Sequence, residues 1–319
     1  MSGKLAALAV LALITASCAP ATEPVASAAE TEQASVVTSP ELATSFRQSV
    51  FLEKCEDWDE WDEPAPPFEL LGDTWYVGTC GIAAILVASP QGHVLIDSGT
   101  EAGGELILAN LRRIGVDPED VRYILASHEH FDHVGGHAIL AKATGAQIIA
   151  SPLAAPVLES GMVSDEDPQA DAGRPAMAPV KVARIIQDGE TLTLGDIAIT
   201  AHATPGHTPG AMSYTWTACA SDDEPPACRR IAYVDSLSPV SADNYRFSDH
   251  PQTIAAFRTS ISKVSQLPCD ELLTPHPSAS SLIEKLRDGT LGSPGQCQRY
   301  AAALTSALDK RLSKERAGG

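Results

Sequence analysis

Residues 127–133 read Ser-His-Glu-His-Phe-Asp-His, which places three imidazoles and an aspartate within six positions. In an extended chain side chains alternate between two faces, so His128, His130 and Asp132 are expected to point the same way. His133 joins them if the chain turns there into a helix. Imidazole nitrogens and carboxylate oxygens are ligands that suit Zn²⁺, so this run predicts a zinc site.

The motif lies between a predicted strand at 121–126 and a predicted helix that Gly135-Gly136 opens at 135–143. Three further predicted strands also end at polar residues that can bind metal: 197–203 before His207, 230–234 before Asp235, and 271–273 before His276. The candidate ligands therefore gather at the ends of strands.

Two later histidines decide how many ions the site holds. Residues 204–210 read Thr-Pro-Gly-His-Thr-Pro-Gly around His207, and residues 274–277 read Thr-Pro-His-Pro around His276. Proline and glycine restrict the loop that carries each imidazole, which favours a fixed ligand position. The four clustered ligands could fill the coordination of one ion or supply half the ligands of two, and the two later histidines favour two ions. The remaining histidines are expected to be ordinary core or surface residues: His93, His137, His202 and His250.

The other apolar patterns predict a mixed fold. Short strands are expected at 74–79, 82–88 and 93–96, and helices at 105–114, 253–264 and 296–312. The first of these helices should end at Gly115 and carry one apolar stripe, formed by Leu106, Ile107, Leu111 and Ile114. Strands that alternate with helices in both halves predict an α/β sandwich, in which two β-sheets pack together with helices outside.

The composition excludes several classes of partner. Of 319 residues 44% are hydrophobic, which suits a globular protein, and the formal charge is −19 from 41 acidic and 22 basic residues. This charge repels nucleic acids and anionic bilayers, so a small-molecule substrate is expected.

The N-terminus resembles an export signal. Residues 1–17 contain Lys4, then the apolar run 5–14, then small residues, which places the chain in the periplasm. Acylation of Cys18 would anchor it to a membrane, and the alternative is ordinary cleavage nearby. We expect a flexible leader over 18–45, one catalytic domain over 46–319, and no transmembrane helix after the signal.

Six cysteines remain after Cys18, and export places them where disulfides persist. The count alone allows about 15 pairings. A local bridge between Cys219 and Cys228 is the simplest choice, because they bracket a polar, proline-bearing stretch. The set would be completed by Cys55 with Cys80 and Cys269 with Cys297. A cysteine-rich zinc site is disfavoured because no Cys-x-x-Cys spacing occurs.

These motifs resemble the metallo-β-lactamase superfamily, whose His-x-His-x-Asp-His signature matches residues 128–133. The resemblance is greater to subclass B3, covers roughly residues 68–300, and rests on the His207 loop together with 75–78 (Trp-Tyr-Val-Gly), 97–99 (Asp-Ser-Gly), 235–238 (Asp-Ser-Leu-Ser), 267–270 (Leu-Pro-Cys-Asp) and 275–277 (Pro-His-Pro). It implies the αβ/βα sandwich of that family and disulfides like those above. It also implies two Zn²⁺ per chain, the first bound by His128, His130 and His207 and the second by Asp132, His133 and His276.

The resemblance implies hydrolysis of the β-lactam amide bond by a metal-activated hydroxide, and hence antibiotic resistance. One ion would polarise the carbonyl and the other would receive the leaving nitrogen. Asp132 is expected to be a ligand, with a second catalytic role of orienting the water left open. Ser236 and Ser238, two apart in an extended stretch, are expected to bind the substrate carboxylate; the alternative is a surface turn. A monomer is expected.

Four other residues near the motifs are expected to lie outside the ligand set. In many superfamily hydrolases an aspartate near this position bridges both metals. The resemblance to subclass B3 implies that Ser236 occupies the equivalent position here, so Asp235 is excluded from the ligand set. Glu129 replaces the small residue common in subclass B3, and alternation points it away from the ions, either behind the ligands or exposed. Phe131 is an expected wall of the site, whereas Trp75 is expected to pack in the core.

Other functions on this fold are less well supported. A glyoxalase II-type thiolesterase usually carries a helical glutathione-binding domain after the last ligand, but only 43 residues follow His276. A lactonase remains the alternative, because a cyclic ester presents the same carbonyl. RNA processing requires a basic groove, and di-iron relatives usually carry Glu where His130 stands. An exported zinc-binding protein without turnover is the alternative from another class. Substrate preference should depend on loops near 155–180 and 240–250.

Overall fold

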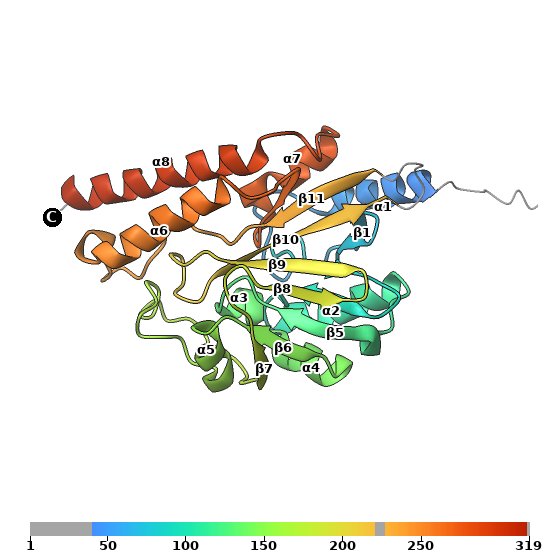
Figure 1. The fold of residues 1–319 in the computed structure, drawn as a ribbon, viewed down its shortest axis with the longest axis horizontal. Helices are drawn as coiled ribbons and strands as arrows, with labels where there is room; N and C mark the ends of the chain where they lie inside the picture. The colour runs from blue at the N-terminus through green and yellow to red at the C-terminus, as the bar shows by residue number, and fades with distance from the viewer. Residues whose placement is uncertain (1–39, 221–226, 318–319) are drawn as a thin grey trace, which may run out of the picture. The chain divides into compact units, whose positions relative to one another are not determined.

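The structure is a computed structural model that describes residues 40–220 and 227–317. The expected export signal, Cys18 and the leader up to residue 39 lie outside the described residues. Helix α1 (Pro40–Lys54) begins within the segment expected to be a leader. The rest of the described chain forms two β-sheets with helices around them (Figure 1).

The first sheet contains seven strands in chain order. Strands β1 to β4 pair antiparallel, and β4 to β7 pair parallel. The strands are β1 (Phe68–Leu71), β2 (Thr74–Tyr76), β3 (Ile85–Val87), β4 (His93–Ile96), β5 (Val121–Leu125), β6 (Gln147–Ala150) and β7 (Val182–Ile185).

The second sheet has the strand order β12-β11-β10-β9-β8. Its one parallel pair is β11 with β12, and the other pairs are antiparallel. The strands are β8 (Thr191–Leu194), β9 (Ile197–Ala203), β10 (Met212–Cys219), β11 (Cys228–Tyr233) and β12 (Glu271–Leu273).

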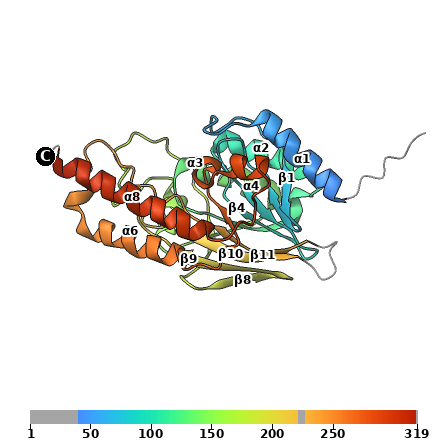
Figure 2. The same ribbon diagram turned by 90° about the horizontal axis from the view of Figure 1, so that it is seen from above.

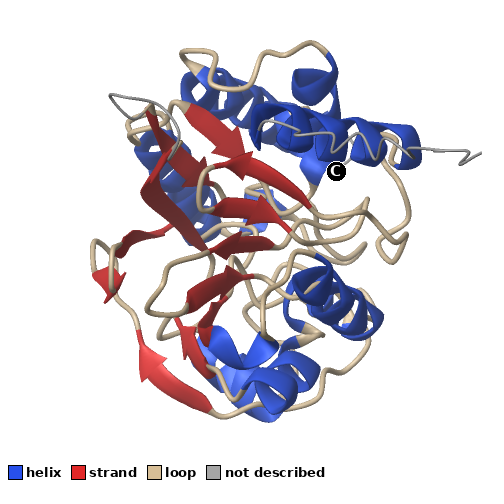
Figure 3. Ribbon diagram, turned by 90° about the vertical axis from the view of Figure 1, so that its right-hand side faces the viewer, coloured by secondary structure: helices blue, strands red, loops and turns tan. Residues whose placement is uncertain are grey.

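Helices cover the outer face of the first sheet and the β11–β12 side of the second (Figures 2 and 3). Apolar side chains of α2, α4 and α5 pack on the first sheet, and those of α6 and α8 pack on the second. The remaining elements have the bounds α2 (Glu101–Arg113), η1 (Pro118–Asp120), α3 (Phe131–Val134), α4 (His137–Thr144), α5 (Ala154–Ser160), η2 (Phe247–Asp249), α6 (Pro251–Val264), η3 (Pro277–Ser280), α7 (Leu282–Arg287) and α8 (Gln296–Ala317).

Alternation along the central strands explains this layering. In β3 the side chains of Ile85 and Val87 enter the core between the sheets, whereas Leu86 faces the helices. In β11 Tyr233 enters the same inter-sheet core, and Ala232 packs toward α6 and α8. Strands buried on both faces have nearly continuous apolar sequences, as β3 and the second half of β11 do. The predicted α/β sandwich is confirmed.

The topology brings the candidate ligands to one edge. Parallel strands β4 and β5 end together, as do β11 and β12. Strand β9 runs in the same direction as β11, because both pair antiparallel with β10. The segments that follow β5, β9 and β12 carry the histidine motif, His207 and His276.

Helix α2 begins earlier than the pattern predicted. The hydroxyl of Thr100 accepts a hydrogen bond from the Gly103 amide at 3.1 Å and caps the helix. The buried face includes Ile107 and Leu108, whereas Leu106 is only partly buried, so the expected stripe was displaced. A Cβ atom on Gly104 would lie 2.9 Å from the Cα of Gly136, so glycine lets α2 approach the motif closely.

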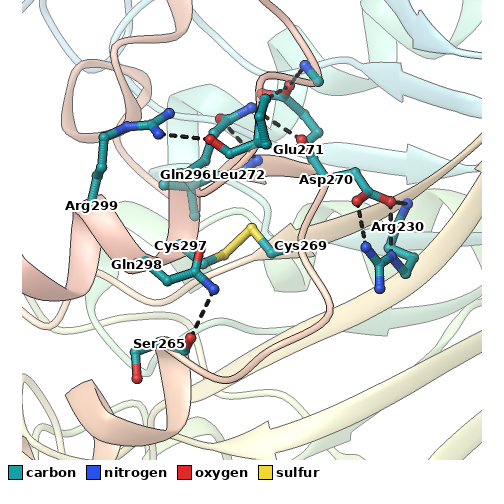
Figure 4. The surroundings of a disulfide bond; sticks show 12 residues. Arg230, Ser265, Cys269, Asp270, Glu271, Leu272, Gln296, Cys297, Gln298 and Arg299 are labelled. Atoms are coloured by element: carbon teal, nitrogen blue, oxygen red, sulfur yellow. Dashed lines mark hydrogen bonds and ion pairs between the residues drawn. A yellow bond between two sulfur atoms is a disulfide. The ribbon is translucent and has the colours of Figure 1, made fainter.

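All three expected disulfides are present: Cys55–Cys80, Cys219–Cys228 and Cys269–Cys297. The last joins the entry of β12 to the start of α8, beside the ion pair between Arg230 and Asp270 (Figure 4). Each disulfide lowers the conformational entropy of the unfolded chain, which stabilises the fold by roughly 2–4 kcal/mol. Within the described residues no helix combines the length and apolar character needed to cross a bilayer.

Candidate metal centre

Two adjacent groups of three side chains form the centre. The first trio is His128, His130 and His207, whose ligand atoms lie within 4.8 Å of one another. The second trio is Asp132, His133 and His276. In this trio the Nε2 of His133 lies 3.1 Å from the Asp132 Oδ2 and 3.3 Å from the His276 Nε2. The Nε2 of His276 lies 3.5 Å from the same Asp132 oxygen. The structure thus brings all six expected ligands together.

The motif turns earlier than we expected. His130 is extended, with φ −84° and ψ 151°, but α3 begins at the next residue. The expected extended conformation up to Asp132 is therefore wrong, because the helical turn already includes this residue. Asp132 and His133 occupy the first turn of α3, where both contact His276. Their ligand atoms also lie within 4.8 Å of a ligand atom of His128, so the two trios adjoin at this ring.

Each imidazole of the first trio is fixed through one nitrogen. The Nδ1 of His128 lies 2.9 Å from the Asp235 Oδ1, and the Nδ1 of His207 lies 2.9 Å from the Ser238 carbonyl. His130 uses its other nitrogen, Nε2, which lies 2.8 Å from the Asp167 Oδ2. The hydrogen bonds set the tautomers of His130 and His207, and in all three rings one nitrogen is left for a ligand.

A buried atom without a partner supports a bound cation. The Nε2 of His128 is buried and has no hydrogen-bond partner among the residues that the structure describes. Such an atom costs free energy unless something binds it. Asp235 contacts the opposite nitrogen of the same ring, so it lies behind the ligand and not among the trio.

Burial keeps most of these rings neutral. It lowers the pKa of His207 to about 3 and of His276 to about 4, and holds the pKa of His128 well below its usual value. Neutral imidazole is the form that binds a metal.

His133 is the exception. Burial lowers its pKa, but Asp132 and Asp97 outweigh this and raise it to about 10. Without metal, a proton therefore stabilises the buried carboxylates, and a divalent cation would take its place. The nitrogen and carboxylate donor set fits zinc.

Asp97, at the end of β4, organises the motif from behind. It accepts hydrogen bonds from the Ser127 amide at 2.6 Å, the Ser127 hydroxyl at 2.7 Å and the Tyr233 hydroxyl at 2.6 Å. Its Oδ2 lies 3.5 Å from the His133 Nδ1. We assigned no role to Asp97 from sequence, although it follows a strand as the ligands do.

Of the two candidate substrate serines, Ser238 contacts the centre, and the stretch that carries both is not extended. Leu237 between them has a φ of 44°, so the expected alternation is wrong. The hydroxyl of Ser236 is buried and has no hydrogen-bond partner among the described residues. The hydroxyl of Ser238 lies 3.2 Å from the His207 Nδ1.

Glu129 points away from the trios and is buried, not exposed. Its carboxylate accepts hydrogen bonds from the Thr208 hydroxyl at 2.7 Å and the Gly210 amide at 2.8 Å. Burial raises its pKa, and these two contacts oppose the rise. Glu129 therefore ties the histidine motif to the His207 loop.

The outer wall of the centre includes a residue that the sequence patterns missed. The ring of Trp61 lies 5.5 Å from that of Phe131 and 6.0 Å from that of His276. Trp75 instead lies beneath Arg47. Two further residues come from the loop after α5: Gln169, whose Nε2 lies 3.5 Å from the His207 Nε2, and Arg174. The histidines expected to be ordinary lie outside both trios: His93, His137, His202 and His250.

Comparisons with known proteins agree with this geometry. The family model described as the metallo-beta-lactamase superfamily matches residues 77–219. The solved structure of the metallo-β-lactamase MIM-1 from Novosphingobium pentaromativorans has a TM-score of 0.81 and 50% identity, with 85% of this chain and 99% of that chain covered. MEM-A1, a subclass B3 metallo-β-lactamase from a soil metagenome library, has a TM-score of 0.76 and 39% identity, covering 82% and 100%. The chain belongs to the metallo-β-lactamase superfamily, within which it resembles subclass B3.

Curated relatives match over a shorter stretch. The hydroxyacylglutathione hydrolase of Anaeromyxobacter dehalogenans (strain 2CP-C) is 33% identical over 132 residues, which cover 41% of this chain and 40% of that protein. The chain thus spans about two fifths of the length of this relative.

The contact between Asp167 and His130 predicts an effect on metal affinity. Asp167→Asn removes the charge that holds the His130 tautomer, so one of the two zinc ions should bind about 10- to 100-fold more weakly. Competition with a chromophoric chelator measures this. Asp165→Asn, an exposed substitution on the same loop, should leave both affinities unchanged. Wild-type affinity for both ions in Asp167→Asn would show that this contact does not support the metal.

Proposed function

We propose that this protein is an exported, zinc-dependent β-lactamase that hydrolyses the β-lactam amide bond and confers resistance to these antibiotics. The observation that carries the proposal is the pair of adjacent trios, which offers nitrogen and carboxylate ligands for two cations at one sheet edge. The metallo-β-lactamase MIM-1, at 50% identity over nearly its whole length, supports the same activity.

The chain's own residues would divide the work as follows. His128, His130 and His207 would hold one zinc, and Asp132, His133 and His276 the other. When bound, the two ions would supply a water activated for attack and Lewis-acid stabilisation of the negative charge that develops. Asp132 would also orient the water, because it is the carboxylate of the second trio and lies within 3.5 Å of both imidazoles there.

Substrate positioning would rest on the turn after β11. The Ser236 hydroxyl has no partner among the described residues, so it is free to donate to the carboxylate that a fused β-lactam carries. Ser238 lies beside His207 and would contact the same group directly or through water. Phe131 and Trp61 would form the apolar wall against which the ring system packs.

We place the protein in the periplasm as a monomer. The three disulfides suit an oxidising compartment. Residues 1–17 have the composition of an export signal, and acylation of Cys18 would add a membrane anchor. The catalytic domain would extend over residues 46–319.

A chromogenic cephalosporin assay tests the proposal. The zinc-loaded protein should hydrolyse the cephalosporin, a chelator should abolish turnover, and added zinc should restore it. The same preparation should be tried on a lactone and on a glutathione thiolester. Faster turnover of either would replace β-lactams as the substrate class, and no turnover of any substrate with two zinc ions bound would contradict an enzymatic role.

A further inference from the structure

An arginine stands at the rim of the metal centre. The guanidinium carbon of Arg174 lies 5.7 Å from the centre of the Phe131 ring and 5.9 Å from that of Trp61. Both distances suit cation–π packing, which fixes the plane of the guanidinium. Trp61 in turn lies 6.0 Å from His276 of the second trio.

A buried glutamine holds Arg174 beside the first trio. The Arg174 Nη2 donates to the Gln169 Oε1 at 2.8 Å. Gln169 is buried, and its Nε2 lies 3.5 Å from the Nε2 of His207, the nitrogen left for a metal. Ser238 contacts the other nitrogen of His207. Arg174 and the turn that carries Ser236 and Ser238 therefore lie on different sides of the His207 imidazole.

The charge of Arg174 is not neutralised by a neighbour. No carboxylate of the described residues lies within ion-pair distance of it, although the chain carries 41 acidic residues. Some other exposed arginines form ion pairs, such as Arg122 with Asp120. A guanidinium has five N–H donors, and Gln169 is the acceptor recorded for this one, so donors remain for an anion.

We infer that Arg174 binds a second anionic group of the substrate, a carboxylate or sulfonate on the side chain that extends away from the β-lactam ring. This inference rests on the proposed function. The ring carboxylate is attached next to the reacting amide and must lie beside the metals, where the serines are. Arg174 is separated from His207 by a glutamine side chain, so it meets a group that projects to the rim. Arginine suits this role because it binds carboxylates through two parallel hydrogen bonds.

The test compares two penicillins that differ by one carboxylate, benzylpenicillin and carbenicillin. In Arg174→Gln, kcat/KM for carbenicillin should fall about tenfold, mainly through KM, while the value for benzylpenicillin changes less than about twofold. Arg174→Lys should recover part of the loss. Arg122→Gln removes the same charge far from the centre, where salt screens it, and should leave kcat/KM for both substrates unchanged, which controls for long-range electrostatics.

Binding of the hydrolysed products gives a second readout that does not need turnover. Calorimetry on the zinc-loaded protein should show that Arg174→Gln weakens binding of hydrolysed carbenicillin and spares that of hydrolysed benzylpenicillin. Unchanged zinc content and unfolding midpoint would exclude a structural effect. Equal changes for both ligands, or none, would overturn the inference. A wild type that binds these products as expected but hydrolyses neither penicillin would instead contradict the proposed function.

Discussion

Asp132→Ala is expected to lower kcat by about 10³-fold, equivalent to about 4 kcal/mol of transition-state stabilisation. The substitution removes the only carboxylate of the second trio, which lies 3.1 Å from His133 and 3.5 Å from His276. Both the cation and the orientation of the attacking water depend on this group. Steady-state kinetics at saturating zinc, with the metal content of each variant, measure the effect.

The serine variants are the comparison for Asp132→Ala. Ser236→Ala and Ser238→Ala should each lower kcat/KM by about tenfold or less, mainly through KM, because each removes a hydrogen bond to substrate. Asp196→Ala, which changes an exposed aspartate in the turn between β8 and β9, should behave as wild type. Equal losses for Asp132→Ala and the serine variants would contradict the roles assigned to them.

Glu129→Ala is expected to lower the free energy of unfolding by about 3 kcal/mol, because it leaves two buried donors without an acceptor. These donors are the Thr208 hydroxyl and the Gly210 amide. Both donors belong to the loop that carries His207, so losing the Glu129 carboxylate should also loosen this ligand. The variant should therefore release zinc from the first trio more readily. Urea unfolding and a chelator competition measure the two effects.

Glu129→Gln is the matched variant. It keeps the shape of the side chain and one carbonyl acceptor, so it should lose less stability than Glu129→Ala. If Glu129→Ala unfolds within about 0.5 kcal/mol of wild type and holds its zinc normally, the carboxylate does not join the two loops.

Much of the fold was predictable because several of its strands are apolar segments with clear ends. The predicted bounds of 93–96, 197–203 and 271–273 are those of β4, β9 and β12. Strand β10 was not predicted, and its sequence mixes apolar with polar residues. Ser213 and Thr215 are buried there because the Thr204 hydroxyl and His202 satisfy their hydroxyl groups. The edge strand β7 is largely exposed, so it has no apolar alternation to detect.

The candidate ligands were predictable because motif, proline and glycine signals mark them locally. Their partners were not. Asp167, Gln169 and Arg174 reach the centre from a loop without periodic pattern, and Trp61 from another such loop. Contacts of this kind depend on how distant segments pack, which no local spacing encodes. Glu129 was correctly directed away from the trios by alternation, but its partners on the His207 loop were not predicted.

The number of zinc ions held by each folded chain is the most direct measurement. Elemental analysis of purified protein, combined with native mass spectrometry, should give two zinc ions per chain, and Asp132→Ala should keep one firmly and release the other. Fewer than one firmly held ion per wild-type chain would contradict the account.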